Sequence, residues 1–197
     1  MNLVIIIGCI LVAMTVHEFM HAYTGHLLGD STAHDEGRIS LNPLKHVDPV
    51  MTVLLPAVAY AFFQVLIMAA KPVPFNPHRV KYGEYGAALI ALAGPASNLV
   101  LAGVTALVLS GTGISGGLEY VLYTFMQLNV ALFVFNIIPL PPLDGSRILY
   151  AFAPEPVQEF MNRIEPYGLI IIIVLVMVGG FGLILQNINQ SILQFLL

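Results

Sequence analysis

Charge is scarce in this sequence of 197 residues, in which 9% of the residues are charged and 58% are hydrophobic. A typical soluble domain carries about 25% charged residues. The net charge is only -4, and no basic cluster indicates a nucleic-acid partner. We therefore expect an integral, multi-pass membrane protein that lies in the lipid bilayer.

Cysteine is almost absent as well. A single cysteine, Cys9, excludes a disulfide framework and a cysteine-based metal site. Basic residues are missing from residues 1–16, whereas a secretory signal begins with a positively charged region. We expect this N-terminal apolar segment to be a retained membrane helix.

The abundant feature is long apolar runs. A helix that spans the hydrocarbon needs about 20 apolar residues. Five segments meet this requirement, at about residues 2–27, 50–70, 86–110, 119–139 and 167–186.

The connections between these segments carry shorter elements. Residues 29–48 are rich in turn formers and contain a short strand candidate at Gly37–Leu41. Residues 154–166 space their apolar side chains as a helix lying on a membrane surface does, although an ordinary packed surface helix has the same pattern.

The predicted fold is an all-α polytopic membrane protein with a helical bundle of about four to five transmembrane segments. One segment is expected to be re-entrant, and a short β element is expected in the loop after the first helix. We expect one membrane-embedded domain over residues 1–197. Its core covers about residues 2–150, and residues 154–197 hold the amphipathic helix and the last transmembrane helix.

The stretch "TVHEFMHAY", residues 15–23, places ionisable side chains at the end of the first apolar segment. His17 and His21 are four residues apart and share one face of a helix, so both can bind one cation. Glu18 is placed to reach a water on that cation without being a ligand. Such groups are costly to bury in a membrane and indicate function, although membrane histidines also serve as helix–helix hydrogen-bonding groups.

A catalytic zinc keeps three protein ligands and one water, so a third ligand is needed. Asp144 is the best candidate, because it lies among apolar residues in "FNIIPLPPLDGSRIL" just after the fourth segment. The prolines of this stretch end the helix. Taken alone, Asp144 would more often form a turn or cap a helix that begins near Ser146, but beside two imidazoles we expect a ligand.

HEFMH in a membrane helix followed by "NIIPLPPLDG" resembles the site-2 protease family of intramembrane zinc metalloproteases, peptidase family M50. The stretch "ALAGPASN", residues 91–98, is similar to that family's G-P-x-x-N segment. The resemblance covers about residues 10–150 and implies a small member without PDZ or CBS domains. It implies one Zn²⁺ ion on His17, His21 and Asp144, with Glu18 as the catalytic base.

Two asparagines match the same family motifs. Asn136 matches the first residue of N-x-x-P-x-P-x-L-D-G, and Asn98 matches the last residue of G-P-x-x-N. Each is expected either to contact the substrate or its oxyanion or to support the site. The resemblance implies an endopeptidase that cleaves within or near the transmembrane segments of its substrates, which would be single-pass membrane proteins.

The order of the segments predicts a topology in the cell membrane. HEFMH and Asp144 must meet at one depth, so the first and fourth segments run in one direction and the third runs in the other. Segment 50–70 is then re-entrant, and all seven basic residues lie on one side. The positive-inside rule makes that side cytoplasmic and puts the active site toward it.

An unwound substrate peptide can regain its backbone hydrogen bonds by pairing with a strand edge. The strand candidate after the first helix offers such an edge, and we expect Arg38, Ile39 and Ser40 to clamp the substrate. A purely structural hairpin is the alternative for these residues.

Two other functions fit part of the pattern. A divalent-metal transporter would use the same histidines and aspartate, but it predicts further membrane-embedded ligands along a path and has no need of Glu18. A non-enzymatic membrane scaffold would need none of these four side chains.

Overall fold

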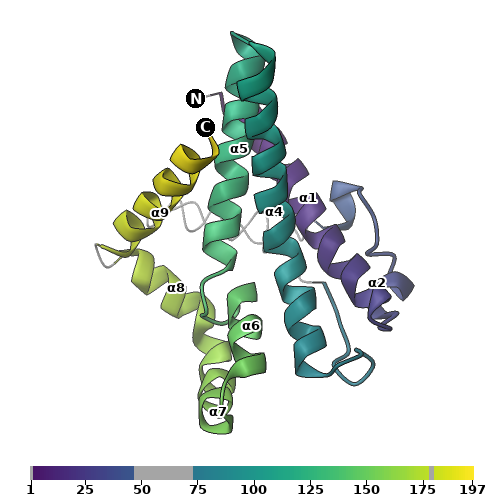
Figure 1. Cartoon of the computed structure of the whole chain (residues 1–197). Helices are drawn as coiled ribbons and strands as arrows, with labels where there is room; N and C mark the ends of the chain where they lie inside the picture. The colour runs from purple at the N-terminus through teal and green to yellow at the C-terminus, as the bar shows by residue number, and fades with distance from the viewer. Residues whose placement is uncertain (1, 47–72, 178–179) are drawn as a thin grey trace.

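A computed structural model describes residues 2–46, 73–177 and 180–197 (Figure 1). These residues form helices and short turns, and no strand occurs among them. The elements are α1 (Leu3–Leu27), α2 (Thr32–Asp35), the 3-10 helix η1 (Pro43–Lys45), α4 (Glu84–Thr112), α5 (Gly117–Asn136), α6 (Asp144–Phe152), α7 (Glu155–Ile164), the 3-10 helix η3 (Glu165–Tyr167), α8 (Gly168–Met177) and α9 (Phe181–Leu196).

Three of these helices, α1, α4 and α5, are long and apolar enough to cross a membrane. They correspond to the first, third and fourth apolar segments of the sequence, and the protein is a multi-pass membrane protein. The second segment, residues 50–70, lies outside the described residues, and so does the prediction that it is re-entrant.

Two hydrogen bonds define the directions of the long helices. The Asn2 N–H donates to the Tyr120 hydroxyl at 3.3 Å, so α1 and α5 begin at the same end of the bundle. The Lys81 N–H donates to the Leu28 carbonyl at 2.8 Å, so the chain leaves α1 and approaches α4 at the opposite end. As expected from the need to bring the ligands to one depth, α1 and α5 run in one direction and α4 in the other (Figure 1).

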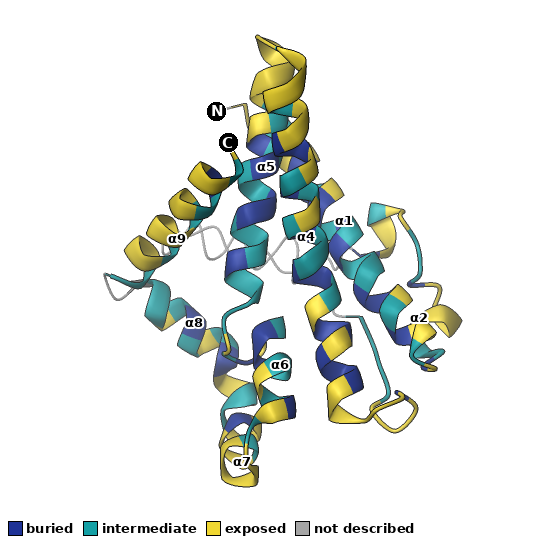
Figure 2. Cartoon of the chain, in the orientation of Figure 1, coloured by how far each residue is buried: buried dark blue, intermediate teal, exposed yellow. Residues whose placement is uncertain are grey.

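Small side chains lie where the long helices meet. Ala13 on α1 and Ala102 on α4 have no exposed surface, and Ala91 is also buried. Close backbone approach through small residues is the usual way in which membrane helices associate. The outward faces carry large exposed apolar side chains, such as Leu107 on α4 and Leu118 on α5. The exposed stretches of both helices are yellow in Figure 2. This pattern fits a bundle surrounded by lipid.

The predicted fifth segment, residues 167–186, is divided between two helices. Helix α8 ends at Met177 and α9 begins at Phe181, and the helical pair that contains them is bent by 83°. Gly180 has a φ of 122°, which is open to glycine but strained for other residues. After this bend α9 packs on α5, where Leu193 joins a buried cluster with Met126 and Val130.

The helix expected over residues 154–166 forms as α7, with Met161 buried and Phe160 exposed. The strand expected at Gly37–Leu41 does not form. Instead, the Arg38 N–H donates to the Ala33 carbonyl at 2.8 Å and the Ser40 N–H donates to the Arg38 carbonyl at 2.9 Å. These local bonds compete with a strand ladder, and no strand among the described residues offers a partner.

The same turn is closed from its other end. The Arg38 guanidinium donates to the Lys45 carbonyl, and the His46 ring donates to the Ser40 carbonyl at 2.7 Å. The substrate clamp predicted for Arg38, Ile39 and Ser40 therefore loses the extended edge on which it was based.

Candidate metal centre

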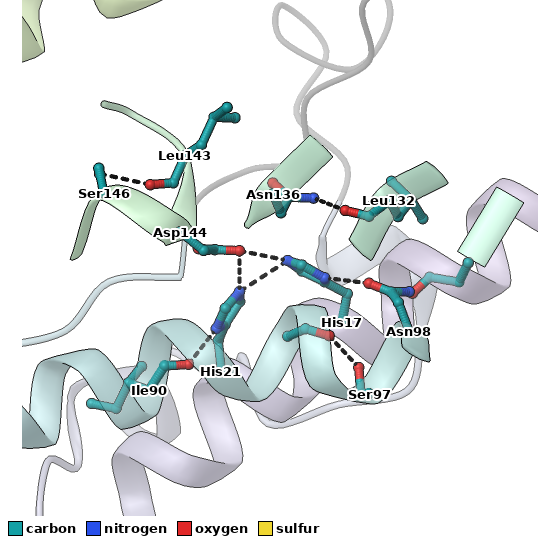
Figure 3. A network of polar contacts seen from close by, with 12 residues as sticks. His17, His21, Ile90, Ser97, Asn98, Leu132, Asn136, Leu143, Asp144 and Ser146 are labelled. Atoms are coloured by element: carbon teal, nitrogen blue, oxygen red, sulfur yellow. Dashed lines mark hydrogen bonds and ion pairs between the residues drawn. The ribbon is translucent and has the colours of Figure 1, made fainter. Parts of the chain in front are cut away.

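Three ligand atoms from distant parts of the chain converge between α1 and α6 (Figure 3). The helical period of α1 puts both imidazoles on one face, and the proline-rich turn after α5 brings Asp144 to them. His17 Nε2 lies 2.9 Å from His21 Nε2 and 3.1 Å from Asp144 Oδ2. His21 Nε2 lies 3.3 Å from the same carboxylate oxygen. Both histidines are buried.

The triangle formed by these atoms fits a metal ion. Ligands at 2.0–2.2 Å from a tetrahedral zinc are separated by about 3.3 Å, close to the three distances in this cluster. Within residues 2–46, 73–177 and 180–197, this is the one group of three such side chains whose ligand atoms converge. Two imidazoles and one carboxylate are also the donor set of many catalytic zinc sites.

The other nitrogens of the two rings explain why Nε2 is free to bind. His17 Nδ1 lies 2.6 Å from Asn98 Oδ1, and His21 Nδ1 lies 2.7 Å from the Ile90 carbonyl oxygen. Both partners are acceptors, so each Nδ1 carries the ring proton and each Nε2 keeps its lone pair. Such partners commonly orient metal-binding histidines.

Gly94 on α4 allows the two rings to lie against the helix backbone. A Cβ atom at this position would overlap His21 Nε2 and Cε1 and would also meet His17 Cε1. In the sequence, Gly94 was recognised only as the glycine of the G-P-x-x-N segment. Its close contact with the two histidine rings could not be predicted from that motif. Its position beside Pro95 inside an apolar segment was the available signal.

Asp144 is the first residue of α6, and its carboxylate reaches the histidines rather than capping the helix. Gly145 makes this turn tight, because a Cβ there would overlap the carbonyls of Ile137 and Ile138.

A cavity of about 430 Å³ lies beside the cluster and includes His17, His21 and Asp144 in its wall. Glu18 and Asn136 line it as well, together with apolar side chains of α4, α5 and α8. Glu18 follows His17 on α1 and is half-buried. The Asn136 Nδ2 donates to the Leu132 carbonyl at 2.9 Å.

The structure separates the two asparagines that the sequence suggested. Asn98 lies behind His17 with no exposed surface, whereas Asn136 lines the cavity. Asn98 also donates through Nδ2 to Asn129 on α5 at 2.9 Å. Asn129 was missed in the sequence, although an asparagine inside an apolar segment is a recognisable signal.

The chain is similar in sequence to known zinc metalloproteases. The model of Peptidase family M50 matches residues 110–179, the part of the chain that contains Asp144. The Bacillus subtilis protein named "Putative zinc metalloprotease YwhC" is 39% identical over 175 residues, which cover 84% of this chain and 77% of that protein. This chain belongs to peptidase family M50.

More distant relatives of this M50 peptidase carry a similar name. The "Putative zinc metalloprotease Rip2" of Mycolicibacterium smegmatis is 30% identical over 189 residues, covering 87% of this chain and 66% of that protein. The protein of the same name from Mycobacterium tuberculosis is 28% identical over 179 residues. The chain therefore spans about two thirds of the Rip2 proteins, with the same 66% share for both. No solved structure matches the M50 peptidase.

These findings confirm the family resemblance read from the two motifs and the peptidase class that it implied. The roles of the individual residues remain predictions, now supported by the convergence of His17, His21 and Asp144.

Proposed function

We propose that this M50 peptidase is a zinc-dependent intramembrane endopeptidase. The observation that carries the proposal is the convergence of His17, His21 and Asp144 at a cavity that also contains Glu18. Zinc is the metal, because the relatives are named zinc metalloproteases and this donor set leaves one position open for water. When bound, zinc would supply Lewis-acid polarisation of a water molecule and of the scissile carbonyl.

Glu18 moves the proton in this scheme. Glu18 lines the cavity next to His17, and its carboxylate would accept a proton from the attacking water and return it to the nitrogen of the leaving amine. His17, His21 and Asp144 hold the metal in place, and the acceptors behind the two rings keep both Nε2 atoms unprotonated.

The two asparagines have different roles in this proposal. Asn136 lines the cavity, so we assign it to contact with the substrate backbone or oxyanion. Asn98 is buried behind His17 with its amide bonded to that ring and to Asn129, so we assign it to support of the site.

The wall of the cavity supports a proposal for the substrate class. Most of its wall is apolar, with Phe135 and Leu132 from α5 and Ile172 from α8. An apolar segment of a single-pass membrane protein, unwound at the scissile bond, matches that wall. Because backbone groups in lipid must be hydrogen-bonded, the segment has to lose its helix only where the protein covers it.

Charge supports an active site on the cytoplasmic side of the cell membrane. The described basic residues follow α1, precede α4 or follow α5, and all these positions are at the end of the bundle nearer the metal centre. The positive-inside rule makes this end cytoplasmic. A cysteine introduced as Ser115→Cys should then be labelled from outside intact cells, whereas His78→Cys should not. Labelling of His78→Cys from outside would reverse the assignment.

The central test is Glu18→Gln, which keeps the size of the side chain and removes the base. We expect the variant to retain zinc and to lose about 10²–10⁴-fold in the rate of cleavage of a single-pass model substrate in lipid nanodiscs. Glu36→Gln is the matched control, because Glu36 is exposed in the turn after α2. It should cleave at the wild-type rate.

The other functions predict different results in this experiment. A transporter would move metal across vesicles equally well with Glu18→Gln, and a scaffold would cleave nothing even as wild type. Cleavage by Glu18→Gln at the wild-type rate would contradict the proposed role of Glu18.

A further inference from the structure

A chain of side-chain amides extends from His17 away from the cavity and through two other helices. Asn98 Oδ1 on α4 accepts from His17 Nδ1 at 2.6 Å (Figure 3), and Asn98 Nδ2 donates to Asn129 Oδ1 on α5 at 2.9 Å. Asn129 Nδ2 in turn donates to the Phe125 carbonyl at 2.9 Å. Both asparagines have 0% exposed surface.

The direction of every bond in this chain follows from its last member. The Phe125 carbonyl can only accept a hydrogen bond, so the NH₂ of Asn129 must face it. The oxygen of Asn129 then faces Asn98, which presents its own NH₂ to that oxygen and its Oδ1 to His17. His17 Nδ1 therefore donates, and the lone pair of this ring is at Nε2.

Reversal of the Asn98 amide would have a direct chemical consequence. Its NH₂ would face His17 Nδ1, and the ring would have to carry its proton at Nε2. That proton would point at His21 and Asp144, where a metal would have to bind. In the reversed state, the oxygen of Asn98 would also face the oxygen of Asn129 without a hydrogen between them.

We propose that Asn129 is a positioning residue of the metal centre, which holds the Asn98 amide in one orientation and thereby keeps Nε2 of His17 available to zinc. The inference rests on the metal site of the proposed function, but it does not depend on Glu18 or on proteolysis.

A second acceptor limits the size of the effect. Asn98 Nδ2 also lies 3.4 Å from the Ala13 carbonyl oxygen, at the long end of hydrogen-bonding distances. This carbonyl favours the same orientation of the amide, but more weakly than Asn129 does. Loss of Asn129 should therefore weaken metal binding without abolishing it.

A role in helix association alone predicts something else. Buried asparagines join membrane helices by hydrogen bonds, and loss of such a bond lowers stability without changing the metal affinity of the folded protein. Thr124→Val is the matched control, because Thr124 is a buried polar residue of α5 whose hydroxyl, among the described residues, bonds to the Tyr120 carbonyl of its own helix, at 2.8 Å.

The experiment compares Asn129→Leu with Thr124→Val in the full-length protein in nanodiscs. Zn²⁺ affinity is measured by competition with a chelator, and bound Co²⁺ is followed by its visible absorption spectrum. We expect Asn129→Leu to bind both metals about ten-fold more weakly, within the range for residues that orient metal ligands, and to alter the Co²⁺ spectrum. Thr124→Val should match the wild type in both. Equal affinities and spectra for the two variants would overturn the inference.

Two further variants test the route through Asn98. Asn129→Asp keeps an oxygen that accepts from Asn98 and should retain most of the wild-type affinity, and a full loss equal to that of Asn129→Leu would count against the proposal. In an Asn98→Ala background, Asn129→Leu should change the affinity by less than about two-fold, since the residue through which it acts is gone. A ten-fold loss in that background would also overturn it.

Failure of the inference is distinguishable from failure of the proposed function. A wild-type protein that binds neither Zn²⁺ nor Co²⁺ would refute both, whereas metal binding that is insensitive to Asn129 would refute only the positioning role.

Discussion

The back of the histidine pair is buried and tightly packed, whereas its front opens on a cavity of about 430 Å³. At the back, Gly94 and Asn98 of α4 lie against the rings and leave no room for an added methyl group at Gly94. At the front, Asp144 follows the turn after α5 and lines the cavity. Glu18 is half-buried in the same cavity wall.

This difference separates two tasks. In the proposed function, the back determines which nitrogen of each ring is available to the metal, and that task requires rigid partners with a single hydrogen-bond direction. The front must admit water and a peptide, so its side chains are in contact with a cavity and its wall includes loop residues such as Val73 and Phe75. Substitutions on the two sides should therefore fail in different ways.

The largest effect is expected at the front, from Asp144→Asn. The amide keeps the size of the side chain but removes the charge that two imidazoles cannot supply. We expect a loss of zinc affinity beyond the roughly 10–100-fold that changes to ligand-orienting residues cost, measured by chelator competition. Glu155→Gln, an exposed acid near the start of α7, is the control. Wild-type affinity in Asp144→Asn would remove Asp144 from the ligand set.

The next effect is expected at the back, from Gly94→Ala. The added methyl group overlaps both rings, and overpacking of this kind costs about 1–3 kcal/mol. Because the rings must move, zinc affinity should fall together with thermal stability.

Gly103→Ala provides a control within the same helix. A Cβ at Gly103 meets no atom within 4 Å, so this variant should keep zinc and gain up to about 1 kcal/mol from better helix propensity. If both alanine variants bind zinc like the wild type, the back of the site is less tightly packed than its geometry indicates.

The smallest effect concerns the loop that forms part of the front wall. Asp30, which is buried after α1, accepts from the Asn76 N–H at 2.6 Å and from the Thr32 N–H at 3.0 Å. Asp30→Ala should release residues 73–76, and hydrogen exchange of the Asn76 amide should become at least about ten-fold faster, equivalent to about 1.4 kcal/mol. Asp35→Ala, which removes an exposed carboxylate, should leave this amide protected.

The hydrogen bonds that Asp30 accepts also predict a pH dependence of the loop. Burial raises the pKa of the Asp30 carboxyl, but hydrogen bonds from Thr32 and Asn76 lower it by more, so the pKa is below its ordinary value. A lowered pKa means that the stabilisation is fully present above the unfolded value of about 3.9 and is lost as the pH falls through the folded value. Protection of the Asn76 amide should therefore be constant from pH 7 to about pH 5 and decrease below about pH 4.

Much of the bundle was predictable because hydropathy is a local property. The apolar lengths of α1, α4 and α5 predict membrane helices whatever their partners are. The packing of α9 on α5 through Leu193 was not predictable in this way, because it depends on where the two helices meet. The strand at Gly37–Leu41 failed for a related reason, since a strand needs a partner that propensity does not supply.

The residues of the candidate metal centre also differ in how far the sequence predicts them. The spacing of His17 and His21 predicts their shared face, because the helical period alone determines it. Asp144 was proposed from its apolar surroundings and from a family motif. Gly94 and Asn129 were missed, because their importance comes from the positions at which α4 and α5 cross α1.

The sequence by itself determined that this protein lies in a membrane and which side chains are available to a metal, since both follow from composition and from spacing along one helix. Only the tertiary structure decided which nitrogen of each ring faces Asp144 and which asparagine lies behind His17. The physical reason is that a hydrogen bond has a direction and a length of about 3 Å. Its partners, such as His17 and Asn98, are 81 positions apart in the chain and meet only where the helices pack.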